Sequence, residues 1–134
     1  MTGTGARNTR LLGEHWLKLH SGQRGTKFRV SRFYPADRSR ARRDTWWFEF
    51  PESDFAEEGK CTSFLCQDES NPRQFHHLLV PNSFIQRIKS ELDFRVDRQL
   101  YSIYLSADDK DRFKELRGSG GTDFSAFLQR PSVG

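Results

Sequence analysis

The sequence predicts a mainly β fold of the α+β class: an open, mostly antiparallel β-barrel or pseudobarrel of about seven strands with two short helices. Segments rich in aromatic and β-branched residues recur between short turns, as is typical of strands. Because these segments follow one another closely, neighbouring strands are expected to pair in antiparallel fashion. The 134 residues suit one core, and a sheet of this size tends to curl so that its edge strands are hidden.

The N-terminal part of the chain contains a predicted tail, a predicted hairpin and a further strand. Residues 1–13 are small, polar and glycine-rich, which predicts a disordered tail. Residues 14–20 and 26–34 are expected to form the hairpin around the turn SGQRG, although the first segment is also compatible with the start of a helix. Residues 45–50 (TWWFEF) have the aromatic content of a strand.

The middle of the chain contains two predicted strands and a predicted helix. Residues 51–60 begin with proline and carry early acids, which is typical of a short helix or turn. Residues 61–67 and 75–80 are predicted strands, and a polar loop at 68–74 separates them. A proline then opens a predicted helix over 81–92, because proline favours the first helical position and apolar residues follow at helical spacing.

The C-terminal part combines a strand with irregular segments. Residues 99–106 alternate in polarity, which predicts a strand, and residues 107–117 are expected to form one or two helical turns. The GSGG stretch at 118–121 indicates a flexible hinge. Residues 123–128 are expected to pack back onto the core through their aromatic side chains.

Length and composition indicate one domain in a reducing compartment. We expect a single domain over residues 14–128 and a linker or cut end at 129–134. No window approaches about 18 continuous apolar residues, and the start of the chain lacks an apolar signal core, so neither a membrane span nor secretion is expected. Cys61 and Cys66 point to opposite faces of a predicted strand, so no disulfide is expected between them.

Charge is distributed unevenly along the chain. Residues 1–50 hold 11 Lys and Arg against 4 Asp and Glu, whereas residues 51–134 hold 11 against 14, and the whole chain has a net charge of +4. This asymmetry favours a face that meets a polyanion, with DNA or RNA as the first candidates. The alternative is an uneven distribution that arose by chance.

Signals for catalysis are weak. Asp54 with the EGK stretch at 58–60 imitates the trio of metal-dependent nucleases, but their carboxylates must converge on Mg²⁺ from different strands. His76 and His77 are adjacent in a predicted strand, so they face opposite sides and cannot share a metal. We therefore expect a binding domain with no catalytic residue, no metal and no cofactor. A metal-dependent nuclease fragment is kept as an alternative.

The most basic stretch, SRFYPADRSRARRDTWW, connects two predicted strands. In an extended arm Arg38, Arg40 and Arg42 share one side, and arginine can read guanine edges or clamp phosphate. Arg32 and Arg43 lie nearer the strand ends and are expected to clamp phosphate. The alternative is a solvated hairpin loop whose charges serve only solubility.

A second loop, QDESNPRQ, precedes the unit FHHLLVPNSFIQRI, in which a strand ends with hydrophobic-proline and a short helix follows. Residues 14–106 with this unit resemble the DNA-binding pseudobarrel shared by the plant B-three transcription-factor domain and the effector domain of EcoRII-type restriction endonucleases. The stretch SRFYPADRSRARRDTW is similar to the basic arm of those effector domains. In those relatives the basic arm follows the strand–proline–helix unit, whereas here it precedes it.

The resemblance implies a function. Such domains grip the major groove of double-stranded DNA with two arms, which here would be the basic stretch and residues 68–75. It implies sequence-specific recognition within a type II restriction endonuclease, a target such as CCWGG, a catalytic nuclease domain in the parent chain, and the prokaryotic cytosol as location. The candidate DNA-binding residues are Arg32, Tyr34, Asp37, Arg38, Arg40, Arg42, Arg43, Asn71, Arg73, Gln74 and His76. Asp37 is expected to orient the arginines or to accept a hydrogen bond from a cytosine amino group.

The run of aromatics in the third predicted strand keeps an RNA-binding alternative open. Trp46, Trp47 and Phe48 are consecutive, so one tryptophan could be exposed for stacking on a base, as in RNA-binding sheets. The other interpretation places both tryptophans in the core, one on each face of a covered strand. A small RNA-binding β-barrel is therefore an alternative function.

Overall fold

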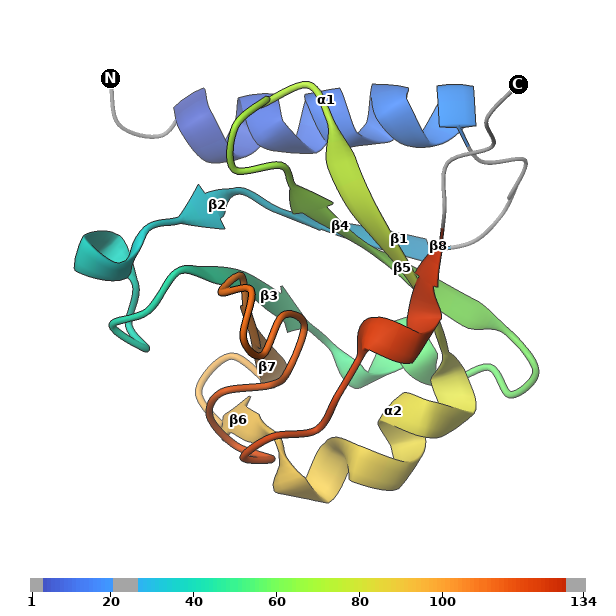
Figure 1. Ribbon diagram of the computed structural model, residues 1–134. Coiled ribbons are helices and arrows are strands. Elements are labelled where there is room, and N and C mark those ends of the chain that lie inside the picture. Colours follow the sequence, from blue (N-terminus) through green and yellow to red (C-terminus); the bar gives the residue numbers. More distant parts are fainter. Residues whose placement is uncertain (1–3, 21–26, 130–134) are drawn as a thin grey trace.

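Two β-sheets form the frame of the protein. The computed structural model describes residues 4–20 and 27–129, and within these ranges eight strands form two four-stranded sheets accompanied by two α-helices (Figure 1). The predicted class, mainly β within α+β and mostly antiparallel, is confirmed. None of the described helices is long and apolar enough to cross a membrane.

The first sheet has the strand order β1-β4-β5-β8. Its strands are β1 (Lys27–Ser31), β4 (Cys61–Gln67), β5 (Phe75–Pro81) and β8 (Leu128–Gln129). β1 pairs with β4 in parallel, whereas the β4–β5 and β5–β8 pairs are antiparallel. Parallel neighbours need a long connection, and here the connection between β1 and β4 contributes two strands to the second sheet.

The second sheet has the order β2-β3-β7-β6 and its pairs are antiparallel. Its strands are β2 (Phe33–Tyr34), β3 (Thr45–Phe50), β7 (Leu100–Ser106) and β6 (Asp93–Arg95). The strand predicted over 26–34 is thus broken at Arg32, where the chain passes from one sheet to the other. Ser31 stabilises this crossing, because its hydroxyl oxygen accepts a 2.8 Å hydrogen bond from the backbone N–H of Trp47.

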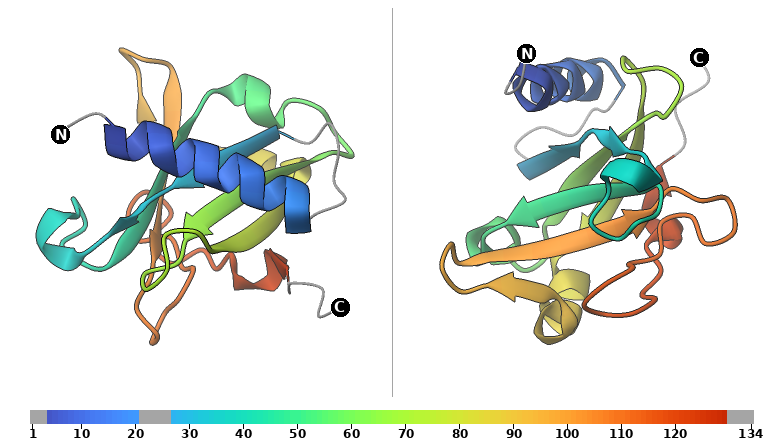
Figure 2. Two further views of the ribbon diagram at one scale, coloured as in Figure 1. Left: turned by 90° about the horizontal axis from the view of Figure 1, so that it is seen from above. Right: turned by 90° about the vertical axis from the view of Figure 1, so that its left-hand side faces the viewer.

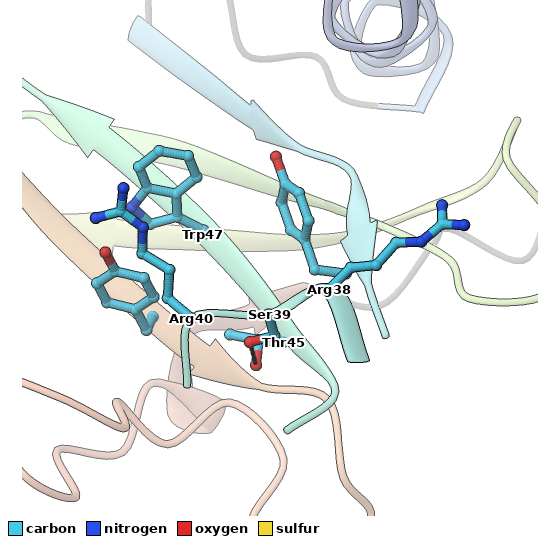
Figure 3. A pocket seen from close by; sticks show the side chains of 7 residues that line it. Arg38, Ser39, Arg40, Thr45 and Trp47 are labelled. Atoms are coloured by element: carbon cyan, nitrogen blue, oxygen red, sulfur yellow. Dashed lines mark hydrogen bonds between the residues drawn. The ribbon is translucent and has the colours of Figure 1, made fainter. Parts of the chain in front are cut away.

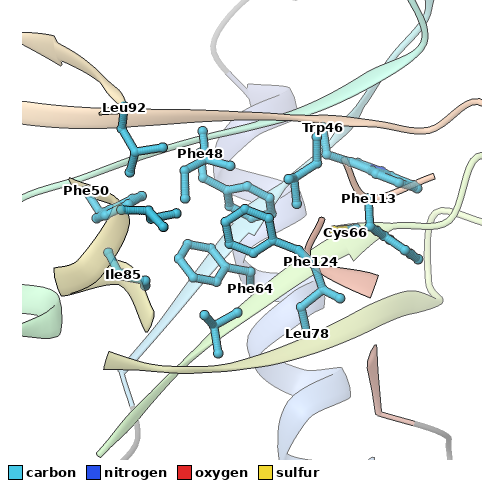
Figure 4. Close-up of a cluster of buried hydrophobic side chains, with 14 of the residues drawn as sticks. Trp46, Phe48, Phe50, Phe64, Cys66, Leu78, Ile85, Leu92, Phe113 and Phe124 are labelled. Atoms are coloured by element: carbon cyan, nitrogen blue, oxygen red, sulfur yellow. The ribbon is translucent and has the colours of Figure 1, made fainter. Parts of the chain in front are cut away.

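Aromatic side chains fill the space between the sheets (Figure 4). Phe48 and Phe50 of β3 both meet Phe64 of β4 in edge-to-face geometry, with ring centroids 5.0 and 5.5 Å apart. This geometry suits the charge distribution of aromatic rings, so a few large residues suffice for the core. The predicted helix after β5 is confirmed as α2 (Asn82–Ile88), which adds the buried Ile85 to the core.

The N-terminal segment is helical, which makes two predictions wrong. α1 (Thr4–His20) occupies most of the tail predicted to be disordered and the whole of the first strand of the predicted hairpin. The helix lies across the outer face of the first sheet (Figures 1 and 2). Buried Trp16 and Leu17 pack there with Leu65 and Phe75, which explains why a polar, glycine-containing segment is ordered.

A close approach between α1 and β1 depends on Gly13. A Cβ on this residue would lie 2.8 Å from a side-chain methyl of Val30. The Trp16 indole N–H also donates a 3.3 Å hydrogen bond to Oε1 of Gln74, beyond the end of β4. The absence of a side chain at Gly13 and the hydrogen bond from Trp16 thus both allow α1 to lie close to the first sheet.

The segment after β7 is a closed loop, which makes the predicted helical turns over 107–117 wrong. The buried carboxylate of Glu115, 1% exposed, accepts hydrogen bonds from the backbone N–H groups of Tyr104 and Ser119 at 3.0 and 2.8 Å. It also accepts a bond from the Ser119 hydroxyl. The GSGG stretch expected to act as a flexible hinge is instead held to Glu115, through Ser119 at the carboxylate and the Gly121 N–H at the backbone carbonyl.

Gly118→Ala is expected to destabilise the protein. A Cβ at this position would lie 2.5 Å from the Glu91 carbonyl oxygen and from the Asp93 amide nitrogen, and backbone atoms cannot move aside as a flexible side chain can. We expect the free energy of unfolding, measured by urea denaturation, to fall by about 3 kcal/mol, at the upper end for an overpacked site.

Gly59→Ala is the matched control. Gly59 has a φ of +78°, and nothing lies within 4 Å of the position that a Cβ would take, so this variant isolates the backbone cost. That cost is about 1–2 kcal/mol for an L-residue in the left-handed region. Equal losses in the two variants would contradict the close packing of Gly118.

Candidate nucleic-acid interface

Three loops lie next to one another at one end of the two sheets. They are the basic loop (residues 35–44) between β2 and β3, the β4–β5 loop (68–74) and the post-β7 loop (107–112). Arg43 forms an ion pair with Asp111, and Arg112 forms one with Glu69, so the post-β7 loop connects the other two. In the right-hand view of Figure 2 the three loops occupy the same half of the molecule. The two predicted arms are therefore brought together by a loop that the sequence analysis did not single out.

Trp46 lies beneath the three loops and is fully buried. Its indole N–H donates a 2.8 Å hydrogen bond to the backbone carbonyl of Gln67, at the end of β4. Its ring stacks on Phe113 with centroids 5.4 Å apart, and the Arg112 guanidinium lies 5.1 Å from the indole centroid. Trp46 thus connects the second sheet to the first, at the base of the basic loop and of the β4–β5 loop.

The basic loop is folded into turns, so the prediction of an extended arm is wrong. A short 3-10 helix, Ala36–Arg38, follows Pro35, and the Arg42 N–H donates a 3.0 Å hydrogen bond to the Ser39 carbonyl. Arg42 itself has a φ of +57°. The Asp44 carboxylate accepts a 2.9 Å bond from the Ala36 N–H, which closes the loop at its base. Alternation along an extended chain therefore does not govern where the arginines point.

The arginines of the basic loop fall into two groups. Arg43 makes a two-pronged contact with Asp111, at 2.8 and 2.6 Å, and its pKa is raised by this hydrogen bonding. The Arg43 side chain therefore has a partner within the protein, whereas the sequence analysis expected it to clamp phosphate. Arg38, Arg40 and Arg42 are exposed, and among the described residues their guanidinium groups have no ion-pair or hydrogen-bond partner.

Two further predicted residues lie at the entrance to the basic loop. Arg32 is exposed, and its guanidinium lies 5.5 Å from the centroid of the Tyr34 ring. Asp37, within the short helix, is exposed and free of ion pairs to the described residues. Both remain accessible to a ligand.

The β4–β5 loop is organised by its own polar side chains. The Asp68 carboxylate accepts hydrogen bonds from the backbone N–H groups of Ser70 and Asn71, at 2.8 and 3.1 Å. Partial burial raises the pKa of Asp68, but these hydrogen bonds outweigh it and the net pKa is lowered. The Asn71 side chain in turn accepts a 3.0 Å bond from the N–H of Arg73, whose guanidinium is exposed and without a partner among the described residues.

Two predicted contact residues have side-chain partners within the protein. Gln74 accepts the hydrogen bond from Trp16 of α1. His76 lies with its Nε2 3.0 Å from an Arg112 nitrogen and 3.3 Å from a Glu69 oxygen, and its ring packs 5.5 Å from Trp46. His76 is half-buried and supports the loops, whereas Gln74 stays exposed beside its contact with α1.

One group of potential metal ligands was missed by the sequence analysis. Ligand atoms of Asp68, Glu69 and His76 lie within 4.8 Å of one another, which the adjacent His76 and His77 had not suggested. Arg112 occupies this group, with 2.9 and 3.1 Å hydrogen bonds to Glu69. The guanidinium already supplies the positive charge that these acids require, so the group is accounted for as an ion-pair network.

An aromatic pocket of about 140 Å³ opens beside the basic loop (Figure 3). Its lining consists of Tyr34, Arg38, Ser39, Arg40, Thr45, Trp47 and Tyr104. The Trp47 ring is parallel to buried Tyr104, with centroids 6.0 Å apart, and meets Tyr34 edge to face at 6.3 Å. Neither Trp47 nor Tyr104 was among the predicted site residues, although the run of aromatics in β3 had raised an exposed tryptophan as an alternative.

The nuclease trio considered from the sequence does not assemble around Asp54. Asp54 is 8% exposed, its carboxylate accepts hydrogen bonds from Nε and Nη2 of Arg29, and the Lys27 ammonium lies 4.0 Å away. Lys60 instead approaches Glu57 at 4.0 Å. The acid is therefore neutralised by neighbouring cations of the first sheet.

Comparisons with protein-family models, curated proteins and solved structures gave no match to this chain.

The Arg43–Asp111 pair is expected to make stability depend on pH in the acid range. Hydrogen bonds from Arg43 and Ser106 lower the pKa of Asp111 from 3.8 to about 2. Because the folded state favours the ionised carboxylate, its contribution is present above pH 3.8 and is lost as the pH falls through about 2. We expect the difference in unfolding free energy between the wild type and Asp111→Asn to shrink across this window in urea titrations.

Asp109→Asn provides the control, because the Asp109 side chain in the same loop is fully exposed. This variant is expected to differ little from the wild type at any pH. A difference for Asp111→Asn that stayed constant between neutral and acid pH would show that the carboxylate charge is not what Arg43 recognises.

Proposed function

We propose that this domain binds double-stranded DNA sequence-specifically, with the basic loop and the β4–β5 loop as two arms in the major groove. The observation that carries the proposal is the set of exposed guanidinium groups without partners among the described residues, on loops whose backbones are held by internal hydrogen bonds. These groups belong to Arg38, Arg40, Arg42 and Arg73. Arginine matches both phosphate and guanine edges, and pre-ordered loops lose little entropy on binding.

In this proposal some arginines contact base edges and others contact phosphate. At least one of Arg38, Arg40 and Arg42 reads a guanine edge, and Arg73 reads or clamps from the other arm. Arg32, beside Tyr34, contacts phosphate. Arg43 acts indirectly, because its pair with Asp111 fixes the end of the basic loop against the post-β7 loop.

The wider role we propose is that of a recognition or effector domain in a type II restriction endonuclease of the prokaryotic cytosol. Its fold would be a pseudobarrel of the B-three and EcoRII type, its target CCWGG-like, and the cleavage activity would reside in another domain. The support is local: β5 ends at Pro81 and α2 begins at Asn82, so the strand–proline–helix unit has the form that the resemblance requires. The two sheets flanking one aromatic core are compatible with such a barrel.

Single alanine substitutions of Arg38, Arg40, Arg42 and Arg73 are expected to weaken DNA binding in two distinguishable ways. Loss of a base-reading arginine should cost about 1–3 kcal/mol and relax specificity at one position. Loss of a phosphate contact should weaken all sequences alike and lower the salt slope by about one. Anisotropy titrations against a duplex selected from a randomised pool, and against its scrambled version, measure both effects.

Arg98→Ala is the charge-matched control for this series. Arg98 is exposed in the turn between β6 and β7, at the opposite end of β7 from the three loops. Its removal should leave affinity and salt slope nearly unchanged. If Arg98→Ala weakens binding as much as the loop variants, binding follows net charge alone, and if no loop variant weakens it, the basic loop is not the interface.

A small β-barrel domain that binds single-stranded RNA is the second candidate. One observation favours it: Trp47 is only partly buried and lies in a pocket beside two arginines, as expected for base stacking. Competition between the selected duplex and single-stranded RNA of the same sequence separates the candidates. DNA recognition requires the duplex to compete at least about tenfold better, a difference of about 1.4 kcal/mol.

A further inference from the structure

We propose that the aromatic pocket receives one nucleobase turned out of a bound DNA duplex. The inference rests on the proposed DNA binding and deepens it, because it assigns a binding site to Trp47, Tyr34 and Tyr104 that groove contacts by the two arms do not need. The pocket lies directly beside the basic loop, since Arg38, Ser39 and Arg40 form part of its lining.

The size of the pocket fits a single ring. Its volume is about 140 Å³, and a protein cavity of about 150 Å³ is known to hold one benzene molecule. A pyrimidine has one six-membered ring, whereas a base pair is far larger. A base can therefore enter only after it has left the stack, as in enzymes that extrude a nucleotide from a duplex.

The walls of the pocket provide a fixed stacking surface. Trp47 is braced by Tyr104, whose ring is parallel to it at 6.0 Å, and Tyr104 is itself buried. The Tyr104 backbone N–H is bound to the Glu115 carboxylate, and the Arg117 guanidinium lies 5.2 Å from the Tyr104 ring centroid. Trp47 thus needs no reordering to accept a base, and stacking on an aromatic side chain tolerates any base.

The charges around the pocket favour a nucleotide over a plain aromatic ligand. Two of its lining residues are arginines without ion pairs to the described residues, and its lining contains no carboxylate. Figure 3 shows the Arg40 side chain running toward Trp47, while that of Arg38 points away from it. Arg40 is therefore placed to cover the base, and Arg38 to meet the phosphate of the same nucleotide.

A mismatch scan of the DNA tests the inference. The 134-residue chain is titrated with its selected duplex and with versions that carry one mismatch at each position in turn. Extruding a mispaired base costs less than extruding a paired one. We expect one position at which a mismatch tightens binding by about tenfold, and weakened or unchanged binding at the others.

Two variants connect that position to the pocket. Trp47→Ala, with folding checked by thermal denaturation, is expected to abolish the preference for the mismatch while retaining salt-dependent duplex binding. Arg40→Ala alters an exposed residue without partners among the described ones, so it keeps the test valid if Trp47→Ala does not fold. It is expected to reduce the tenfold preference to about threefold or less. Arg98→Ala should keep the preference intact.

The outcomes separate this inference from the proposed function. Sequence-dependent duplex binding in which every mismatch is neutral or harmful overturns the base pocket and leaves the DNA-binding function standing. A mismatch preference that survives both pocket variants places the extruded base elsewhere and also overturns the inference. Absence of any duplex binding by the wild-type chain refutes the proposed function and, with it, this inference.

Discussion

The hydrogen bond from the buried Trp46 indole to the Gln67 carbonyl is the contact on which the arrangement of the loops depends. The Trp46 indole has zero exposure, and leaving its N–H unpaired would cost about 1–3 kcal/mol. The Gln67 side chain extends the junction: it accepts a bond from the N–H of Phe33 in β2 and donates one to the Pro72 carbonyl. Two neighbouring strands of one sheet and a loop of the other thereby share a single anchor, and both arms start from it.

The charged residues at this end of the molecule serve two separate purposes. Arg43 and Arg112 are paired with acids from other loops, so their charges fix the positions of the loops relative to one another. Arg38, Arg40 and Arg42 lie within the same short stretch but have no such partners among the described residues. The paired arginines hold the loops in place, and this favours binding by the unpaired ones. A cation on a fixed loop reaches an anion without first having to be ordered.

Local patterns in the sequence were sufficient for β3, β4, β5, β7 and α2, but not for the short strands β6 and β8 or for contacts that depend on distant residues. The α1 helix was missed because Trp16 and Leu17 acquire their apolar partners only when β4 and β5 are in place. The segment 107–117 was predicted wrongly because Glu115 accepts hydrogen bonds mainly from backbone N–H groups, which carry no sequence signal. Likewise, nothing in the sequence of the basic loop distinguishes Arg43 from Arg42. Arg43 pairs with Asp111, which lies far along the chain.

The two-residue strand β8 has a consequence for the order of folding. It pairs His77 with Gln129 and Leu78 with Leu128, so the middle of the outer edge of β5 is covered by residues that follow the other strands of both sheets in the chain. Until these residues emerge from the ribosome, β5 presents an unpaired edge next to a nearly complete sheet. Such an edge is a template for association with other chains. The risk of aggregation through this edge is therefore greatest in the interval after β5 has been made and before β8 has been made.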